Sequence, residues 1–505
     1  MKRLLIKYTF FIGLSVILAS ACNKDLLDTV PNDRLSTNIF WKTEQDAVLA
    51  VNAIYTFLDG NTIFSWDAYT DIAHVNQNFQ PEAFVELGTY DVTSAPVYNA
   101  WAAAYQGIQL SNYFLANVDK VNTTNTALID RLKSEARTIR AYHYIKLAGL
   151  FGDVPLITTP LNVDEAVKLT RTPVAQIYDF VDKELTESAP LLPASYPSAA
   201  DRGRIRQGTA WALKARADLW AGRYQAAVDA ASQVTGYSLN KSYQNLFTYA
   251  GENNSEILLD KQFIKDLVPV NVFNLLAPYS QKNAQGYYVP TRAMVDMYED
   301  NDPRMHFSIF MNGDTLPSGI VFKPTPGGGG ADAIGSTYYS SATGYNIKKY
   351  INNADYADPS NNGINIILLR YAEVLLTYAE AKIELNQLDA SVYDAINKVR
   401  NSRDDVKLPD IAMGKTQAEL RAIVRRERTV ELAFEGLHLF DIRRWKTGAT
   451  VMQGPVYGMT YISNGQPVTV EAVSSTRTFT DKHYLWPIPQ KERDLDPNLS
   501  QNKDW

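Results

Sequence analysis

The chain carries a single cysteine, Cys22, among its 505 residues. No intrachain disulfide is therefore available to hold the fold, although an extracytoplasmic compartment would permit one. The 484 residues from Cys22 onward are enough for one large domain or two ordinary ones. We therefore interpret Cys22 neither as a disulfide partner nor as a nucleophile, and its position in the chain suggests a different use.

A leader segment precedes Cys22. A basic start is followed by an apolar run over residues 8–18 and by the small residues 19–21. That order predicts a signal peptide over residues 1–21, because the run is shorter than the roughly 18 to 20 residues that span a bilayer. Small residues directly before a cysteine form the bacterial lipobox arrangement, although the usual leucine lies one position early, at Leu18. We predict that Cys22 is diacylated, with palmitate among the acyl chains; the alternative is an ordinary secretory signal that contains a cysteine.

Charge and composition limit the partners. Loss of the leader removes Lys2, Arg3 and Lys7 and changes the net charge from −6 to −9. A nucleic-acid partner would need a concentrated basic face, so none is expected. The 5 histidines stand alone, without a second His or Cys at metal-ligand spacing, so no transition-metal site is expected. No cofactor is predicted, and a structural calcium ion in a loop remains an alternative.

Apolar residues recur at three- and four-residue spacing through most of the chain, which predicts a mainly α-helical fold. The predicted helices cover residues 43–59, 98–118, 127–150, 173–188, 207–234, 290–299, 366–386, 391–403 and 417–445. Few strands are expected, and the candidates are residues 256–262, 467–473 and 483–486.

Two helical stretches resemble each other. Residues 214–234 align with residues 377–399 through alanines and a shared turn after Gly or Asn. Small residues on a helix that turns into a second helix are the tetratricopeptide pattern, because small side chains let paired helices approach closely. The alternative is two unrelated alanine-rich helical hairpins.

Two loop-rich regions, about 60–97 and 280–363, interrupt the helical pattern. Loops of this length are usually functional or disordered. Exposed aromatic rings offer a flat partner for the apolar face of a sugar, and neighbouring Asn, Asp or Arg can bind its hydroxyls. Trp66 is the first choice for such a ring, whereas helical aromatics such as Trp211 are expected in the core. The predicted ligand-binding residues are Trp66, Asp67, Tyr69, Asn76, Tyr287, Tyr288, Arg292, Tyr338 and Tyr339.

Three acidic residues, Glu427, Glu431 and Glu435, recur every four positions and would share one helical face. Paired carboxylates could cleave a glycosidic bond. We interpret them instead as part of an ion-pair lattice with arginines such as Arg370 and Arg400, because like charges at this spacing repel unless cations lie opposite. No catalytic residue is predicted, and the protein is not expected to be an enzyme.

Six segments in order, behind a lipoprotein signal, resemble the SusD/RagB family of outer-membrane nutrient-binding lipoproteins. They begin with "CNKDLLDTVPNDRLSTNIFWKTEQDAVLAVNAIY" and end with "YLWPIPQKERDLDPNLSQNKDW". The matching segments are residues 22–55, 101–118, 134–158, 368–386, 425–445 and 484–505.

The resemblance implies a single SusD-like domain over residues 22–505, with about four tetratricopeptide-type helix pairs and an irregular ligand-binding region. It also implies a protein that is lipid-anchored at the cell surface, in the outer membrane of a Gram-negative bacterium. Such a protein captures a nutrient and delivers it to a SusC-like TonB-dependent transporter. An oligosaccharide is the predicted ligand, and a peptide is the first alternative. A surface glycoside hydrolase and a tetratricopeptide scaffold that binds only protein are further alternatives. The shared segments belong to the scaffold, so they transfer no binding residue.

Overall fold

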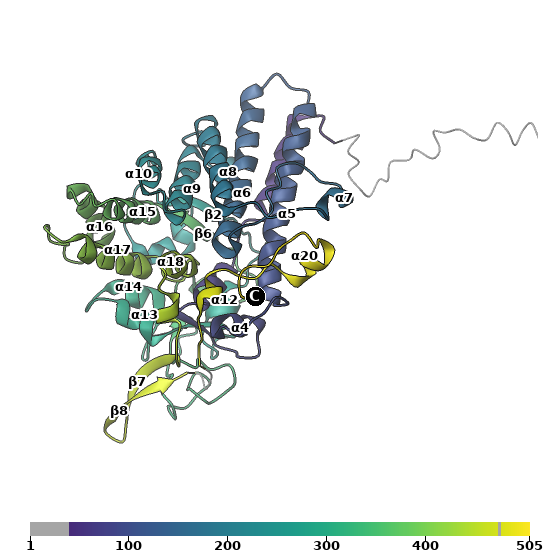
Figure 1. Ribbon diagram of the computed structural model, residues 1–505. Helices are drawn as coiled ribbons and strands as arrows, with labels where there is room; N and C mark the ends of the chain where they lie inside the picture. The colour runs from purple at the N-terminus through teal and green to yellow at the C-terminus, as the bar shows by residue number, and fades with distance from the viewer. Residues whose placement is uncertain (1–39, 473–475) are drawn as a thin grey trace, which may run out of the picture.

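The computed structural model describes residues 40–472 and 476–505. The predicted leader and the predicted lipidation site Cys22 lie outside the described residues. In the described part helices dominate and strands are short, which confirms the predicted mainly α fold (Figure 1). The helices are α2 (Glu44–Tyr55), α3 (Ile63–Ala68), α4 (Pro81–Leu87), α5 (Ala95–Asn117), α6 (Thr126–Phe151), α7 (Val163–Ala166), α8 (Val174–Ser188), α9 (Gln207–Trp220), α10 (Tyr224–Ser232), α11 (Tyr243–Leu246), α12 (Val272–Leu276), α13 (Arg292–Met297), α14 (Pro303–Ser308), α15 (Tyr371–Glu384), α16 (Ala390–Asn401), α17 (Gln417–Glu431), α18 (His438–Arg444), α19 (Gly448–Val451) and α20 (Gln490–Leu495). The strands are β1 (Ala73–Val75), β2 (Ile257–Lys261), β3 (Tyr288–Pro290), β4 (Ile309–Phe310), β5 (Asn346–Ile347), β6 (Ile366–Arg370), β7 (Tyr457–Ser463) and β8 (Gln466–Glu471).

The long helices pack largely in chain order. α5 packs against α6, α6 against α8, α8 against α9, and α9 against α10 (Figure 1). α10 then packs against α15, which also contacts α16 and α17. A hydrophobic cluster runs through these layers and includes buried residues from distant parts of the chain, such as Val51, Leu147 and Leu369. Among the described residues, no helix has both the length and the apolar character needed to cross a membrane.

The two similar segments form helix hairpins of the same construction. Residues 214–234 lie on α9 and α10, and residues 377–399 lie on α15 and α16. Each first helix ends at a residue in the left-handed conformation, Gly222 with φ 72° and Asn386 with φ 57°. In both turns, the residue after the left-handed one donates its backbone N–H to the carbonyl of the residue five positions earlier. The N···O distance is 2.8 Å in the first hairpin and 2.9 Å in the second. This is the six-to-one hydrogen bond of the Schellman motif. The predicted pair of helical hairpins is confirmed.

Two predicted helices are correct only in part, and one predicted strand is wrong. Residues 366–370 form the buried strand β6, paired antiparallel with β2, because a short apolar run cannot be assigned by periodicity alone. The segment 417–445 is split into α17 and α18 by left-handed residues that include Gly436 (φ 78°). A Cβ on Gly436 would lie 2.9 Å from the carbonyl oxygen of Ile63, so glycine allows this turn to contact α3. Residues 481–484 form a 3-10 helix where the strand 483–486 was predicted.

Short antiparallel ladders gather the loop-rich regions at one end of the helical layers. β1 pairs with β3, so that Ala73 faces Pro290 and Val75 faces Tyr288. β4 pairs with β5, and the β7–β8 hairpin projects from the same end (Figure 1). These pairings bring together three segments that are distant in the sequence: residues 76–80, 279–288 and 337–346.

A buried ion-pair lattice ties α17 to other parts of the chain. The Glu431 carboxylate accepts hydrogen bonds from Arg304 (2.9 Å), Arg370 (2.6 Å) and Arg403 (2.8 Å). Burial opposes ionisation of Glu431, but the neighbouring guanidinium groups outweigh it and hold its pKa well below the usual range. Glu427 is likewise bonded to Arg304, at 2.6 Å. The predicted structural role of these carboxylates is confirmed.

Candidate functional site

The residue chosen first from the sequence, Trp66, lies in the core. It sits on α3, only 6 % exposed, and its ring contacts those of Tyr69, Phe440 and Trp486 at centroid distances of 5.6 to 6.2 Å. Tyr69 is also buried, at 5 % exposure. The expectation that these residues present open rings on a loop is wrong, because short helix α3 turns them inward onto the C-terminal segment. Neither ring offers a face to a ligand.

Asp67 is fully buried and serves as a cap for another helix. Its carboxylate accepts hydrogen bonds from the backbone N–H groups of Gly436 and His438, both at 3.0 Å, at the start of α18. Burial raises the pKa of Asp67 to about 6, against the lowering effect of His438 and of these two N–H groups. With its oxygens engaged and no exposed surface, Asp67 cannot bind the hydroxyls of a sugar.

The other predicted aromatic residues are brought together on the outside of the irregular region. Tyr338 is 56 % exposed and Phe79 is 53 % exposed, and their rings lie 5.4 Å apart at an angle of 33°. Tyr339 meets Tyr338 edge-on at 5.6 Å and stacks on Tyr279 at 5.2 Å and 26°. Tyr287 is half-buried beside them, and the nearby phenol of Tyr339 adds to burial in raising its pKa. We call these five rings, from Phe79, Tyr279, Tyr287, Tyr338 and Tyr339, the aromatic surface.

Asn76 fixes the loop that carries two of these rings. Its side-chain oxygen accepts a hydrogen bond from the N–H of Ala342 at 2.7 Å, and its side-chain nitrogen donates to the carbonyl of Ser340 at 3.3 Å. Asn76 is 9 % exposed, so it holds the 337–342 loop against β1. Asn76 was predicted to contact the ligand, and in the structure its side chain bonds to the backbone of the loop that carries Tyr338 and Tyr339.

Two further predicted residues flank the aromatic surface. Tyr288 belongs to β3 and is 9 % exposed, so little of its ring reaches solvent. Arg292 begins α13, where its guanidinium donates to Asp296 at 2.5 Å and to the Thr460 hydroxyl at 2.8 Å. Those bonds join α13 to β7 and leave Arg292 at the edge of the region.

Polar groups lie between the rings of the aromatic surface. The Tyr338 hydroxyl donates to the side-chain oxygen of Asn78 at 2.8 Å, and Asn78 is exposed. Gln80 is partly exposed and donates to Gln77, which in turn donates to the carbonyl of Gln285 at 3.2 Å. The surface therefore alternates flat apolar faces with amide and hydroxyl groups. A sugar ring has matching features, an apolar face of C–H groups and a rim of hydroxyls.

Sequence reasoning did not select Tyr279 or Phe79 for the site. Both follow the rule that selected the others, an aromatic residue next to Pro, Ser, Asn or Gln in a loop-rich region. Tyr279 was missed because it lies one position before the boundary chosen for the second loop region. Phe79 was recognised as a loop residue, but nothing in the sequence places it against Tyr338.

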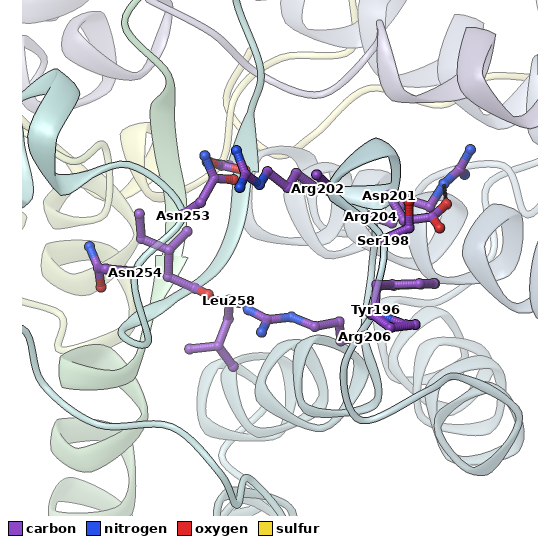
Figure 2. Close-up of a pocket in the computed structure, with 14 residues that line it drawn as sticks. Tyr196, Ser198, Asp201, Arg202, Arg204, Arg206, Asn253, Asn254 and Leu258 are labelled. Atoms are coloured by element: carbon purple, nitrogen blue, oxygen red, sulfur yellow. Dashed lines mark hydrogen bonds and ion pairs between the residues drawn. The ribbon is translucent and has the colours of Figure 1, made fainter.

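A polar cleft elsewhere on the molecule lacks such rings. It encloses about 340 Å³ between residues 196–206 and 253–260. Arg202 and Arg206 extend across it toward the 253–258 segment (Figure 2). Arg206 donates to the carbonyl of Ile257 at 2.6 Å, and Arg204 is bonded to Glu135 at 2.8 Å. The positive charge of the polar cleft is therefore largely engaged within the fold. Tyr196 is the aromatic residue that lines the cleft.

The acidic residues considered for catalysis are closed off from substrate. Glu427 is 2 % exposed and Glu431 is not exposed at all, and both are bonded to arginines. Among residues 40–472 and 476–505, no group of three or more His, Cys, Asp or Glu side chains is placed to hold a metal ion. The aromatic surface is the candidate ligand site in the described structure.

The sequence matches two known family profiles in succession. The profile described as "SusD family" matches residues 205–505, and the profile described as "Starch-binding associating with outer membrane" matches residues 25–219. Two curated relatives from Formosa agariphila are similar along their whole length. SusD-like protein P2 is 26% identical, with 98% of each chain aligned, and SusD-like protein P25 is 24% identical, with 95% of each chain aligned.

Solved structures show the same architecture. A SusD-like carbohydrate binding protein from Bacteroides fragilis matches with a TM-score of 0.84 and 25% identity, over 91% of this chain and 100% of that one. A laminarin binding SusD-like protein matches with a TM-score of 0.75 and 22% identity, over 92% of this chain and 100% of that one; this second likeness shows the fold alone. Because the SusD profile by itself matches more than half of the sequence, the chain belongs to the SusD family.

Proposed function

We propose that this protein binds oligosaccharides at the aromatic surface and presents them to a TonB-dependent outer-membrane transporter. The observation that carries the binding role is the convergence of Tyr338, Tyr339 and Phe79 with Tyr279 and Tyr287, from three distant segments, into one solvent-facing array. A single exposed aromatic residue is ordinary, but a contiguous exposed apolar patch commonly marks a ligand or partner site.

The chemistry of the aromatic surface favours a neutral sugar. A pyranose has one face of C–H groups that packs on a ring, and a rim of hydroxyls that pairs with amides such as Asn78. The charged groups nearby are largely engaged, since Arg292 is bonded to Asp296. The SusD-like carbohydrate binding protein from Bacteroides fragilis, which is 25% identical to this chain, supports the same ligand class.

The transport role rests on family membership and on the predicted leader. The N-terminal profile is described as associating with the outer membrane. Lipidation of Cys22 would anchor the protein to that membrane, and residues 22–505 would form one unit that holds the ligand for the transporter. A SusC-like transporter is the proposed partner.

Affinity measurements with single-ring variants test the binding role. Tyr338→Ala and Tyr339→Ala should each weaken oligosaccharide binding about tenfold, by analogy with nucleobases, for which stacking on one ring is worth roughly 1–3 kcal/mol; 1.4 kcal/mol is one decade. Tyr113→Ala is the matched control, since Tyr113 is a tyrosine of 37 % exposure on α5, away from the site. A panel of oligosaccharides and peptides, titrated calorimetrically, supplies the ligand. Binding confined to peptides, or equal affinity of all three variants, would contradict the proposal.

Two further measurements test the transport role. Cells grown with labelled palmitate should label the wild-type protein and not Cys22→Ser. Purification of the wild-type protein from outer membranes should retain a TonB-dependent transporter. A labelled Cys22→Ser protein would contradict the anchor, and a protein recovered alone at every detergent concentration would contradict the transporter complex.

A further inference from the structure

A second cavity, on the helical side of the molecule, has an unusual charge balance. It encloses about 650 Å³ where the ends of α6 and α9 meet α8, α15 and α18, and we call it the α18 cavity. Three acidic residues line it, Asp153, Glu380 and Glu384. The basic residues that line it are Arg171, Arg223, Arg425, Arg443, Arg444 and Lys446. The lining therefore has an excess of positive charge, although the whole chain carries a net charge of −6.

The carboxylates of the cavity leave several of these cations uncompensated. Glu380 is bonded to Arg444 at 2.6 Å and is not available to the others. Arg171, Arg443 and Lys446 have no carboxylate oxygen within 4.0 Å among residues 40–472 and 476–505. Lys446 instead lies over the ring of Tyr484, with its ammonium 4.2 Å from the centroid.

Arg443 is the clearest case, because it is buried as well as uncompensated. It is 5 % exposed, and its neighbours among the described residues include the hydroxyl of Tyr90, the carbonyl of Gly149 at 3.4 Å and the ring of Trp486, 5.4 Å from its guanidinium carbon, but no carboxylate. Its Nε–H has no acceptor in the described structure. Burial lowers the pKa of Arg443 to about 10. A buried guanidinium is normally matched by carboxylates, as Arg370 is by Glu431 at 2.6 Å.

Two more buried N–H donors on the same cavity lack an acceptor: Nε1 of Trp220 and Nε of Arg425. The Trp220 ring stacks on Phe440 at 4.4 Å and 15°, which gives the cavity an aromatic wall. Burial also lowers the pKa of Arg425 and of Arg171. Cations and a flat ring thus gather around one space, and an oxyanion bound there would supply the negative charge that these cations lack.

We propose that the α18 cavity binds an anionic saccharide, with its carboxylate or sulfate group placed against Arg443 and Lys446. The volume lies in the range of roughly 300–1,000 Å³ that small-molecule sites occupy. An oxyanion supplies the acceptors and the negative charge that the lining lacks, and the ring wall of Trp220 suits the sugar that carries it. The site shares no residue with the aromatic surface, so it is a second binding site and does not depend on the first.

Calorimetric titration of the full chain in detergent tests the proposal, with D-glucuronate, glucose 6-sulfate and glucose as probes at constant ionic strength. At least one acidic sugar should bind at a single site, and glucose should bind at least tenfold more weakly. Binding of glucuronate alone would identify a carboxylate site, and binding of the sulfate alone would identify a sulfate site. If neither acidic sugar binds, or if glucose binds as well as they do, the proposal is wrong.

Variants then locate the binding. Arg443→Met and Lys446→Gln should each weaken acidic-sugar binding at least tenfold, whereas Arg202→Gln, an exposed arginine of the separate polar cleft, should change it less than twofold. Arg443→Met should melt at the wild-type temperature or above, because it removes a buried charge without a partner. If it melts early and binds as wild type does, the guanidinium is structural and the proposal is wrong. If Arg443→Met does not fold, Lys446→Gln decides, since Lys446 is exposed. Tyr338→Ala should leave this affinity unchanged, which separates the two sites.

Discussion

Trp66 and Tyr338 are aromatic residues of the two predicted ligand regions, and their surroundings allow different uses. Trp66 is enclosed by other rings, whereas more than half of Tyr338 faces solvent. A ring face that packs against other side chains stabilises the fold, and only a ring face open to solvent can stack on a ligand. Exposure therefore indicates a role in stability for Trp66 and leaves the Tyr338 ring accessible for the proposed binding.

Replacing Trp66 tests this assignment. Trp66→Ala should lower the free energy of unfolding by about 3–5 kcal/mol, the usual cost of emptying a large aromatic site in a core. Urea unfolding followed by circular dichroism measures the loss. Oligosaccharide affinity below the unfolding transition should stay close to that of the wild type. A variant with normal stability and lost binding would return Trp66 to the ligand site.

Glu431 links single-residue electrostatics to stability. Glu431→Gln should destabilise the protein by about 3–5 kcal/mol at pH 7, because it leaves three guanidinium groups without their common carboxylate.

The pH dependence of this effect has a definite sign. The pKa of Glu431 is lower in the folded state than its ordinary value of 4.5, so its stabilising contribution is complete above pH 4.5 and is lost as the pH falls below that value. The difference in stability between wild type and Glu431→Gln, measured by urea unfolding at several pH values, should shrink in acid. A difference that grows in acid would contradict the lattice.

At the scale of elements, the two helix hairpins show how one residue sets a turn. Gly222 and Asn386 occupy corresponding left-handed positions, and the turns close with the same backbone bond. Glycine reaches this conformation freely, and asparagine does so more readily than most residues. The chain can therefore reverse direction within three residues in the first hairpin and five in the second, and bring the next helix back along the first.

This turn geometry predicts opposite outcomes for two substitutions. Gly222→Ala should destabilise the protein by about 1 kcal/mol, because a Cβ is unfavourable at φ 72° even where nothing lies within 4 Å. Asn386→Gly should be neutral or slightly stabilising for the same reason. Melting temperatures of the two variants provide the measurement. Equal losses for both would show that side-chain contacts, and not backbone conformation, govern the turns.

At the scale of the whole molecule, the helical layers support the irregular, loop-rich region. The lattice around Glu431 joins α17 to residues of α14 and β6, and Asp67 joins α3 to α18. The aromatic surface lies on loops supported by these contacts through β1 and β3. A scaffold that carries loops with exposed rings suits the proposed role in ligand binding.

This arrangement predicts that ligand binding at the loops raises the stability of the folded protein. A saturating oligosaccharide should raise the melting temperature of the wild-type protein, because binding only the folded state adds RT ln(1 + [L]/Kd) to its stability. The rise should be reduced in Tyr338→Ala and retained in Tyr113→Ala. Differential scanning fluorimetry at fixed ligand concentration measures it. An equal rise in both variants would place the bound ligand elsewhere.

Features that depend on a few neighbouring residues could be determined from the sequence alone. The long helices and the turns after Gly222 and Asn386 follow from local periodicity and backbone preference. The two loop regions and several rings of the aromatic surface were also identified, because aromatic residues beside amides and hydroxyls are visible in one dimension. Only the tertiary structure decided which rings face solvent. Strand β6 is recognised by its pairing with β2, and the burial of Trp66 by its contacts in the cluster around Trp486. In the described part of the chain no carboxylate pairs with Arg443, which only the tertiary structure reveals. Burial and pairing are set by residues hundreds of positions apart, and no local pattern carries that information.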